Sequence, residues 1–139
     1  MLSLFPLIQA QDPAASARFY EQLLGLRAVF TADWYVQLQH PDNASVQMAF
    51  IQRRHETVPP EYQQAPAGIL VTMECDDVDA VHERATAAGL PIAQELRDEA
   101  FGQRHFMTVD PDGVLVDVVQ MIEPAAEFAE GYVGDSPQA

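Results

Sequence analysis

The sequence predicts an α+β fold in which two tandem βαβββ modules form a cupped, barrel-like mixed sheet with helices on its outer face. Three observations lead to this prediction: the chain length, a helix signal that occurs twice, and a Pro-Asp turn that occurs twice. The chain has 139 residues, which suits one domain. Its 48% of hydrophobic residues can form a core without disulfides, unlike the composition of a disordered acidic chain.

The two helix signals have the same length. Asp12 to Gly25 and Asp76 to Gly89 each span thirteen positions, and each is followed by Leu. Asp12 with Pro13 behind it is typical of a helix start, and Gly25 can adopt the left-handed conformation that ends a helix. Asp76 or Asp77 can cap the second helix. Each interval carries an apolar stripe at helical spacing, formed by Ala17, Tyr20, Leu23 and Leu24 in the first and by Val78, Val81, Ala85 and Ala88 in the second.

The repeated turn lies between strand-like runs in both halves of the chain. His40-Pro41-Asp42-Asn43 matches Asp110-Pro111-Asp112-Gly113, and both end in a residue that tolerates a positive φ. The helices repeat at an offset of 64 positions and the turns at 70, so the second copy carries about six extra residues between helix and hairpin. Two matches in the same order favour a duplicated unit over two βα units that resemble each other by chance.

These signals define one domain over residues 1–122. Module one (1–52) is expected to contain strands at 3–9, 27–32, 34–39 and 45–51 and a helix at 14–24. Module two (68–122) is expected to contain strands at 68–74, 91–97, 104–109 and 114–120 and a helix at 77–88. Residues 53–67, rich in Pro and Gln, form the predicted linker. Residues 123–139 form an acidic C-terminal tail with one short helix and a frayed end.

Charge and composition exclude several classes of partner. Seven basic residues, all Arg, face 21 acidic ones, and the net charge is −14. Such a chain cannot release counterions from nucleic acid, and an anionic membrane surface is disfavoured for the same reason. No apolar run approaches the roughly 18 residues of a membrane span. The single Cys75 excludes an internal disulfide and a multi-cysteine zinc site.

The N-terminus lacks the basic region of a signal peptide. Together with the lone cysteine, this favours the cytoplasm. A signal peptide cleaved before the first residue of this sequence is the alternative.

Strand alternation assigns residues to the two faces of the sheet. If residues 110–113 form a four-residue loop, Val109 pairs with Val114 and Asp117 lies opposite Phe106. His105, Met107 and Val109 then face the helix. The opposite faces of the two modules would close a cavity whose mixed lining is typical of small-molecule pockets. The candidate ligand-binding residues are Trp34, Val36, Leu38, Gln47, Arg104, Phe106, Thr108 and Asp117.

Two of these assignments have structural alternatives. Arg104 and Asp117 lie on one predicted face of adjacent strands, within reach of an ion pair. They either brace the sheet or form the polar end of the cavity. Trp34 either packs in the core or stacks on a planar or cationic ligand.

The chain resembles the vicinal oxygen chelate superfamily, the group of glyoxalases, bleomycin resistance proteins and ring-cleaving dioxygenases. Three segments carry the resemblance: Asp12-Pro13 through Phe19-Tyr20 to Leu24-Gly25-Leu26; Asp76-Asp77-Val78 through Gly89; and Phe101-Gly102-Gln103-Arg104-His105-Phe106 leading into Asp110-Pro111-Asp112-Gly113. The resemblance covers residues 1 to about 122. It implies two βαβββ modules in one cupped sheet and, often, a homodimer.

The resemblance also implies where a metal would bind. Metal-dependent members place one ligand on the first and one on the last strand of each module, which corresponds to Phe5, Gln47, Ile69 (or Leu70) and Asp117. Hydrocarbon side chains cannot ligate a cation, so only Gln47 and Asp117 remain as weak metal candidates. No cofactor is expected, with a divalent metal ion as the alternative.

The four histidines and Cys75 are expected to be structural or solvated. His40 lies in the first turn, His55 in the linker, His82 on the polar part of the second helix, and His105 on the helix side of its strand. Cys75 precedes the second helix and is interpreted as a small buried residue, with an activated thiolate as the alternative.

Three functions follow from these residues. The first is a metal-free protein that sequesters a small molecule in the cavity between the modules, as in the bleomycin-resistance branch. The second is a lyase, isomerase or dioxygenase with an atypical metal site at Gln47 and Asp117, joined by a residue such as His40 or Glu74. The third, a regulatory or assembly domain, has no sequence feature in its favour. The position of most acids on caps, outer helix faces and the tail indicates that the charge serves solubility.

Overall fold

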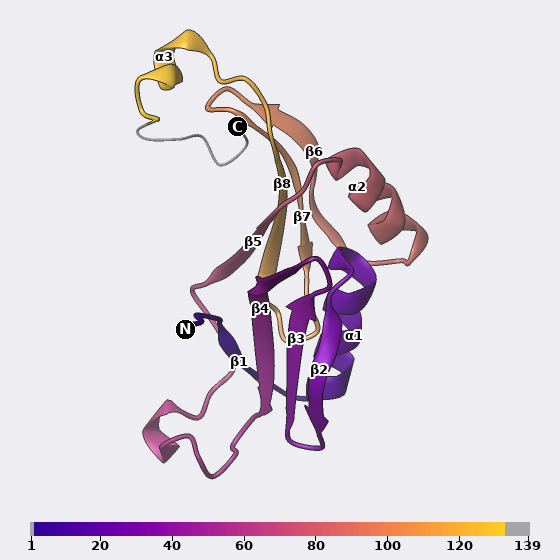
Figure 1. Ribbon diagram of the computed structural model, residues 1–139, viewed down its shortest axis with the longest axis vertical. Coiled ribbons are helices and arrows are strands. Elements are labelled where there is room, and N and C mark those ends of the chain that lie inside the picture. Colours follow the sequence, from indigo (N-terminus) through magenta and orange to yellow (C-terminus); the bar gives the residue numbers. More distant parts are fainter. Residues whose placement is uncertain (1, 133–139) are drawn as a thin grey trace. The chain divides into compact units, whose positions relative to one another are not determined.

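The computed structural model describes residues 2–132, which form two compact units (Figure 1). The first unit comprises the chain up to Ile69 together with Asp110–Val114, and the second comprises Leu70–Val109 and the chain from Leu115 onward. Each unit contains one four-stranded mixed sheet and one helix that covers it. The predicted α+β class and the two βαβββ modules are therefore confirmed.

In the first unit the elements follow the predicted order. They are β1 (Leu7–Ala10), α1 (Pro13–Leu24), β2 (Arg27–Ala32), β3 (Tyr35–His40) and β4 (Asn43–Gln52). The sheet order is β1-β4-β3-β2, with β1 parallel to β4 and the other pairs antiparallel. The Asp12 carboxylate caps α1 by accepting the N–H of Ala15, and Gly25 ends it at φ 70°.

The core of the first unit lies between α1 and one face of its sheet. Tyr20 stacks on Phe50 with ring centroids 5.4 Å apart. Leu23 of α1 and Val36 and Leu38 of β3 are buried beside them. Side chains of this size contribute about 1.5–3 kcal/mol each when fully buried, so this apolar face fixes α1 on the sheet.

The second unit repeats the arrangement. Its elements are β5 (Leu70–Glu74), α2 (Val78–Ala87), β6 (Ile92–Glu99), β7 (Gln103–Val109) and β8 (Leu115–Met121), in the sheet order β5-β8-β7-β6. Asp77, one of the two predicted caps, accepts the N–H of Ala80 at the start of α2. The predicted linker contains a 3-10 helix, η1 (Pro60–Tyr62), and the tail contains the expected short helix, α3 (Ala126–Ala129). Residues 133–139 of the tail lie outside the described residues.

The turn between β7 and β8 corrects one prediction. The backbone N–H of Asp110 donates to the carbonyl of Val114 at 2.9 Å, which closes a three-residue loop with Gly113 at φ 84°. A left-handed glycine at this position is typical of three-residue hairpin loops. Val109 therefore pairs with Leu115 and not with Val114, and Asp117 lies opposite Met107 and not Phe106. Because a one-residue slip exchanges the two faces of a strand, the predicted orientation of every β7 side chain relative to β8 is wrong.

A similar correction applies to β3 and β4. A register irregularity beside Gln39 and His40 sets Val36 opposite Phe50 and Leu38 opposite Met48. Val36 and Leu38 consequently lie on the α1 side of the sheet, while Gln47 lies on the other side. Among the described residues, no helix combines the length and apolar character needed to cross a bilayer.

Candidate functional site

Each sheet has one face that its helix does not cover, which we call the helix-free face. In the first unit it carries residues that alternate with the buried core positions of β3 and β4: Tyr35, Gln37, Gln39, Gln47, Ala49 and Ile51. In the second unit it carries the corresponding positions of β7 and β8: His105, Met107, Leu115, Asp117 and Val119.

The helix-free face of the first unit carries a chain of neutral hydrogen bonds. The Tyr35 hydroxyl donates to Oε1 of Gln37 at 2.6 Å, and Nε2 of Gln37 donates to Oε1 of Gln47 at 2.9 Å. Phe30 lies edge-on to Tyr35 with ring centroids 5.9 Å apart. The face thus combines aromatic surface with amides, which can hold a planar or polar ligand.

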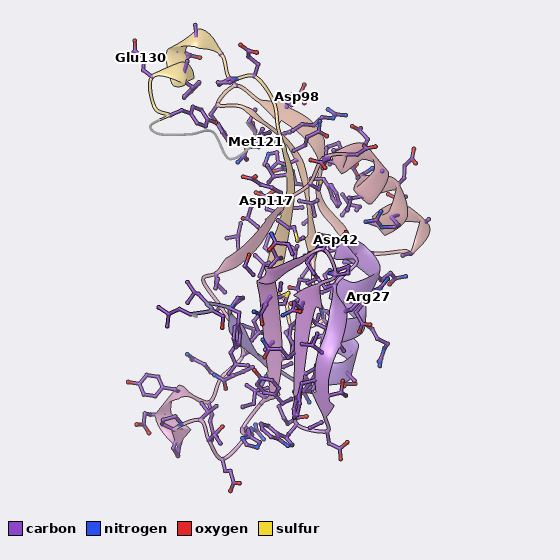
Figure 2. The ribbon with its side chains drawn as sticks, in the orientation of Figure 1. Arg27, Asp42, Asp98, Asp117, Met121 and Glu130 are labelled. Carbon is purple, nitrogen blue, oxygen red and sulfur yellow. The ribbon has the colours of Figure 1, made fainter. Side chains whose placement is uncertain are left out.

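The helix-free face of the second unit is built around a buried histidine. The His105 ring lies between two carboxylates, with Nδ1 2.7 Å from Oδ1 of Asp117 and Nε2 2.8 Å from Oε2 of Glu99. Only 4% of His105 is exposed. Arg97 donates from Nε to Oε2 of Glu99 at 2.9 Å. Figure 2 labels Asp117 on β8.

These contacts set the protonation of the cluster. Burial alone lowers the pKa of His105, but the hydrogen bonds and charges of Glu99 and Asp117 outweigh it and raise the pKa above its usual value. The hydrogen bonds from His105 and Arg97 lower the pKa of Glu99. The raised pKa favours the imidazolium form of His105, in which Nδ1 donates to Asp117 and Nε2 to Glu99. Nε2 of Gln94 also lies 3.3 Å from Nε2 of His105. Glu99 and Asp117 thus each lie beside a group that can carry a positive charge.

The raised pKa of His105 predicts a pH-dependent stability. A raised folded-state pKa contributes stability below the ordinary value of 6.5, and this contribution is lost as the pH rises through the folded-state value. The lowered pKa of Glu99 contributes stability above its ordinary value of 4.5, which is lost as the pH falls. We expect the cluster to stabilise the fold most between about pH 4.5 and 6.5.

Urea denaturation at pH 5.5 and 8.5 measures this effect. The wild type should lose more unfolding free energy over this interval than His105→Gln. His40→Gln removes an imidazole outside the cluster and should retain the wild-type pH dependence. Equal pH dependence in wild type and His105→Gln would contradict the charge assignment.

Three predicted ligand-binding residues of β7 face the helix side. Arg104 forms a bidentate pair with Asp79 of α2, at 2.9 and 3.1 Å, and a third bond to Asp98 at 3.1 Å. Phe106 is fully buried and meets the ring of His82 on α2 edge-on at 5.1 Å. Thr108 is fully buried as well. The predicted Arg104–Asp117 ion pair is therefore wrong, as is the placement of His105 on the helix side.

The remaining candidates divide between the core and the surface. Val36 and Leu38 belong to the core beneath α1. Trp34 precedes β3, is 42% exposed and stacks on His55 with ring centroids 4.5 Å apart, so it does not pack in the core. Gln47 and Asp117 lie on helix-free faces, as predicted.

The sequence reasoning missed Tyr35, Gln37, Glu99 and His105 on these faces. The signal for the first two was present in β3 itself, where Val36 and Leu38 alternate with Gln37 and Gln39. An apolar set and an amide set on one strand indicate which side meets the helix. No comparable signal in β7 distinguishes its two sides, because Phe106 and Met107 are both apolar.

The comparisons with known proteins agree with this architecture. Residues 4–118 match the model of the Glyoxalase/Bleomycin resistance protein/Dioxygenase superfamily. The chain belongs to this superfamily. No curated protein matches it.

Solved structures of the superfamily share the fold. A glyoxalase/bleomycin resistance protein/dioxygenase family enzyme from Burkholderia phytofirmans is 15% identical, with a TM-score of 0.71 over 85% of this chain and 97% of that one. A superfamily protein from Nocardioides is 20% identical, with a TM-score of 0.69 over 88% and 85%. A protein of unknown function from Agrobacterium tumefaciens is 26% identical, with a TM-score of 0.70 over 88% and 95%. At these identities the first two show the fold alone.

The superfamily's metal positions do not fit a metal ion in this chain. Phe5 and Ile69 (or Leu70) offer hydrocarbon only. Oε1 of Gln47 already accepts from Gln37, and Oδ1 of Asp117 is bonded to His105. Within residues 2–132 no group of three or more His, Cys, Asp or Glu side chains is arranged to hold a metal ion.

The additional metal candidates do not complete such a site either. Nδ1 of His40 accepts the N–H of Asp42 at 3.0 Å in the β3–β4 turn. Glu74 lies on β5, paired with Val119 of β8. Cys75 is half-buried, and burial raises the pKa of its thiol, which disfavours the reactive thiolate.

Proposed function

We propose that this superfamily member is a metal-free protein that binds and sequesters a small molecule on the helix-free faces of its sheets. The observation that carries the proposal is the state of the oxygen donors at the superfamily's metal positions. Gln47 is engaged by Gln37, and Asp117 is engaged by His105. A divalent ion at these positions would compete with both hydrogen bonds and would find two protein ligands, fewer than the three that a catalytic metal normally has.

The chemistry of the faces suggests what the ligand is like. The first face offers the ring edges of Phe30 and Tyr35 beside the amides of Gln37 and Gln47. In the second unit, the carboxylates of Glu99 and Asp117 are already bonded to His105, and Glu99 also to Arg97, so they are less available to attract an ion. We therefore propose a planar, polar ligand that is held by stacking and by hydrogen bonds to amides.

A thermal-shift panel tests the binding of such ligands. Aromatic amines and dicarbonyl adducts represent such ligands, and cationic glycopeptides represent the bleomycin-resistance branch. We expect at least one of these probes to raise the unfolding temperature. For that probe, Tyr35→Phe should weaken binding by about two- to tenfold, because it removes the hydroxyl that holds Gln37. Tyr62→Phe changes a tyrosine that is 63% exposed and should leave the affinity unchanged. No stabilisation of a well-folded sample by any probe would contradict the proposal.

A metal-dependent lyase, isomerase or dioxygenase is the second candidate. It is favoured by one observation: an acidic residue, Asp117, occupies a superfamily ligand position with the imidazole of His105 2.7 Å away. Elemental analysis of protein purified without chelator separates the two functions. We expect metal well below one ion per chain and no recovery with nickel, zinc, iron or manganese. Stoichiometric metal would favour the enzyme.

We further propose a cytoplasmic homodimer, since the superfamily often forms dimers and the chain has a single, free cysteine. Sedimentation equilibrium measures the oligomeric state. A monomer at all accessible concentrations would contradict the dimer.

A further inference from the structure

We propose that the first unit contains a second binding site, for a phosphate group, at the point where β4 runs into the linker. Its walls are Gln11, Gln52, Arg53 and Arg54, which enclose a pocket of about 200 Å³. One water molecule takes up about 30 Å³ in the liquid, so the pocket has room for a small polyatomic ion. This site is independent of the helix-free faces and of the function proposed for them.

The lining is chemically suited to an anion. Both of its ionisable side chains are guanidinium groups, which match the oxygens of a phosphate through paired N–H donors. Its other two side chains are amides. Nε2 of Gln52 donates to the carbonyls of Gln11 at 2.8 Å and Ala10 at 3.4 Å, and the Gln11 amide can donate to an anion. No carboxylate lines the pocket. Two adjacent arginines are notable in a chain with only seven basic residues against 21 acidic ones.

Arg53 is held in place and has an unused donor. One of its terminal nitrogens lies 3.0 Å from Oδ1 of Asp112, a carboxylate that is 1% exposed. Asp112 also accepts from the Ser16 hydroxyl at 2.7 Å and from the backbone N–H of Gln11 at 2.9 Å. The Nε of Arg53 is buried and has no acceptor among the described residues. A buried donor without a partner is costly, so an acceptor that reached this nitrogen would be stabilising.

Arg54 supplies the remaining positive charge. Among the described residues it is the only one other than glycine with a positive φ, at 70°. A bulky residue rarely adopts this conformation, and such residues are concentrated at functional sites. Arg54 is exposed and makes no ion pair within the described part of the chain. Since Asp112 neutralises Arg53, Arg54 provides the net charge for the anion.

Titration calorimetry with inorganic phosphate tests the site at an ionic strength of about 150 mM, where distant surface charges are screened. We expect saturable binding that Arg54→Gln weakens at least about tenfold, because a charge-assisted contact is lost. Arg18→Gln makes the same charge change on the exposed side of α1 and should alter the affinity less than about twofold. Glycerol phosphate in place of inorganic phosphate distinguishes a site for the phosphate group of a larger molecule from one for the free ion.

Arg54→Gly provides a second, independent variant. Glycine adopts a positive φ without strain, so this variant should unfold at a higher temperature than the wild type in phosphate-free buffer. It should nevertheless lose the rise in unfolding temperature that phosphate causes in the wild type. Absence of saturation with phosphate, or equal weakening by Arg54→Gln and Arg18→Gln, would overturn the proposal.

Discussion

Replacing Asp110 by alanine is expected to lower the free energy of unfolding by about 3 kcal/mol. The buried carboxylate accepts three hydrogen bonds: from the Tyr20 hydroxyl at 2.8 Å and from the backbone N–H groups of Asp112 at 2.8 Å and Val114 at 2.9 Å. Alanine would leave these donors without a partner. Burial of Asp110 raises its pKa, while the same three donors lower it, so they stabilise the ionised carboxylate.

Urea denaturation of Asp110→Ala measures the loss, and the chain offers a matched control. Asp42 lies exposed in the corresponding β3–β4 turn (Figure 2), so Asp42→Ala should cost less than about 0.5 kcal/mol. Tyr20→Phe removes only one of the three bonds and should cost about 1–2 kcal/mol. The double variant should cost less than the sum, because both changes break the same contact. An equal cost for Asp110→Ala and Asp42→Ala would show that the turn is not held in this way.

Replacing Phe106 by alanine should be at least as costly, about 3–5 kcal/mol, because it opens a cavity between α2 and its sheet. The ring is fully buried and contacts His82. This prediction also tests the corrected register. A side chain that lined a ligand site could be shortened at little cost to stability, whereas a core side chain could not.

The neighbouring Met107 is the control for Phe106. It lies on the helix-free face and is partly exposed, so Met107→Ala should cost less than about half as much. Thermal and urea unfolding of the two variants show which of the two side chains is packed in the core beneath α2. If Met107→Ala lowered the free energy of unfolding more than Phe106→Ala, the assignment of Phe106 to the helix side would be contradicted.

The elements could be predicted because their signals are local. The Asp12 and Gly25 positions that bound α1 depend on a side chain and a φ angle within a single turn of helix. The Pro-Asp turns likewise mark their hairpins through residues adjacent in sequence. Because both signals occur twice in the same order, the sequence also predicted the duplication, which the two sheets confirm.

The candidate site was harder to predict because it depends on register. The loop after Val109 is closed by the Asp110–Val114 pair, and this detail alone exchanged the predicted faces of β7 relative to β8. In the resulting register, Arg104 and Phe106 contact α2, and His105 lies beside Asp117. The partner of His105 on its other side, Glu99, follows an irregular pairing of β6 with β7 that strand alternation does not reveal.

The position of Asp110–Val114 in the first unit has a consequence for synthesis on the ribosome. The preceding part of that unit ends at Ile69, 45 residues before Val114 (114 − 69). At 5–20 residues per second, the ribosome needs roughly 2–9 s to cover this distance. During that interval the hydroxyls of Tyr20 and Ser16 have been made but their carboxylate partners, Asp110 and Asp112, have not. The nascent first unit can therefore form its sheet early but can complete its polar contacts only after most of the second unit has been translated.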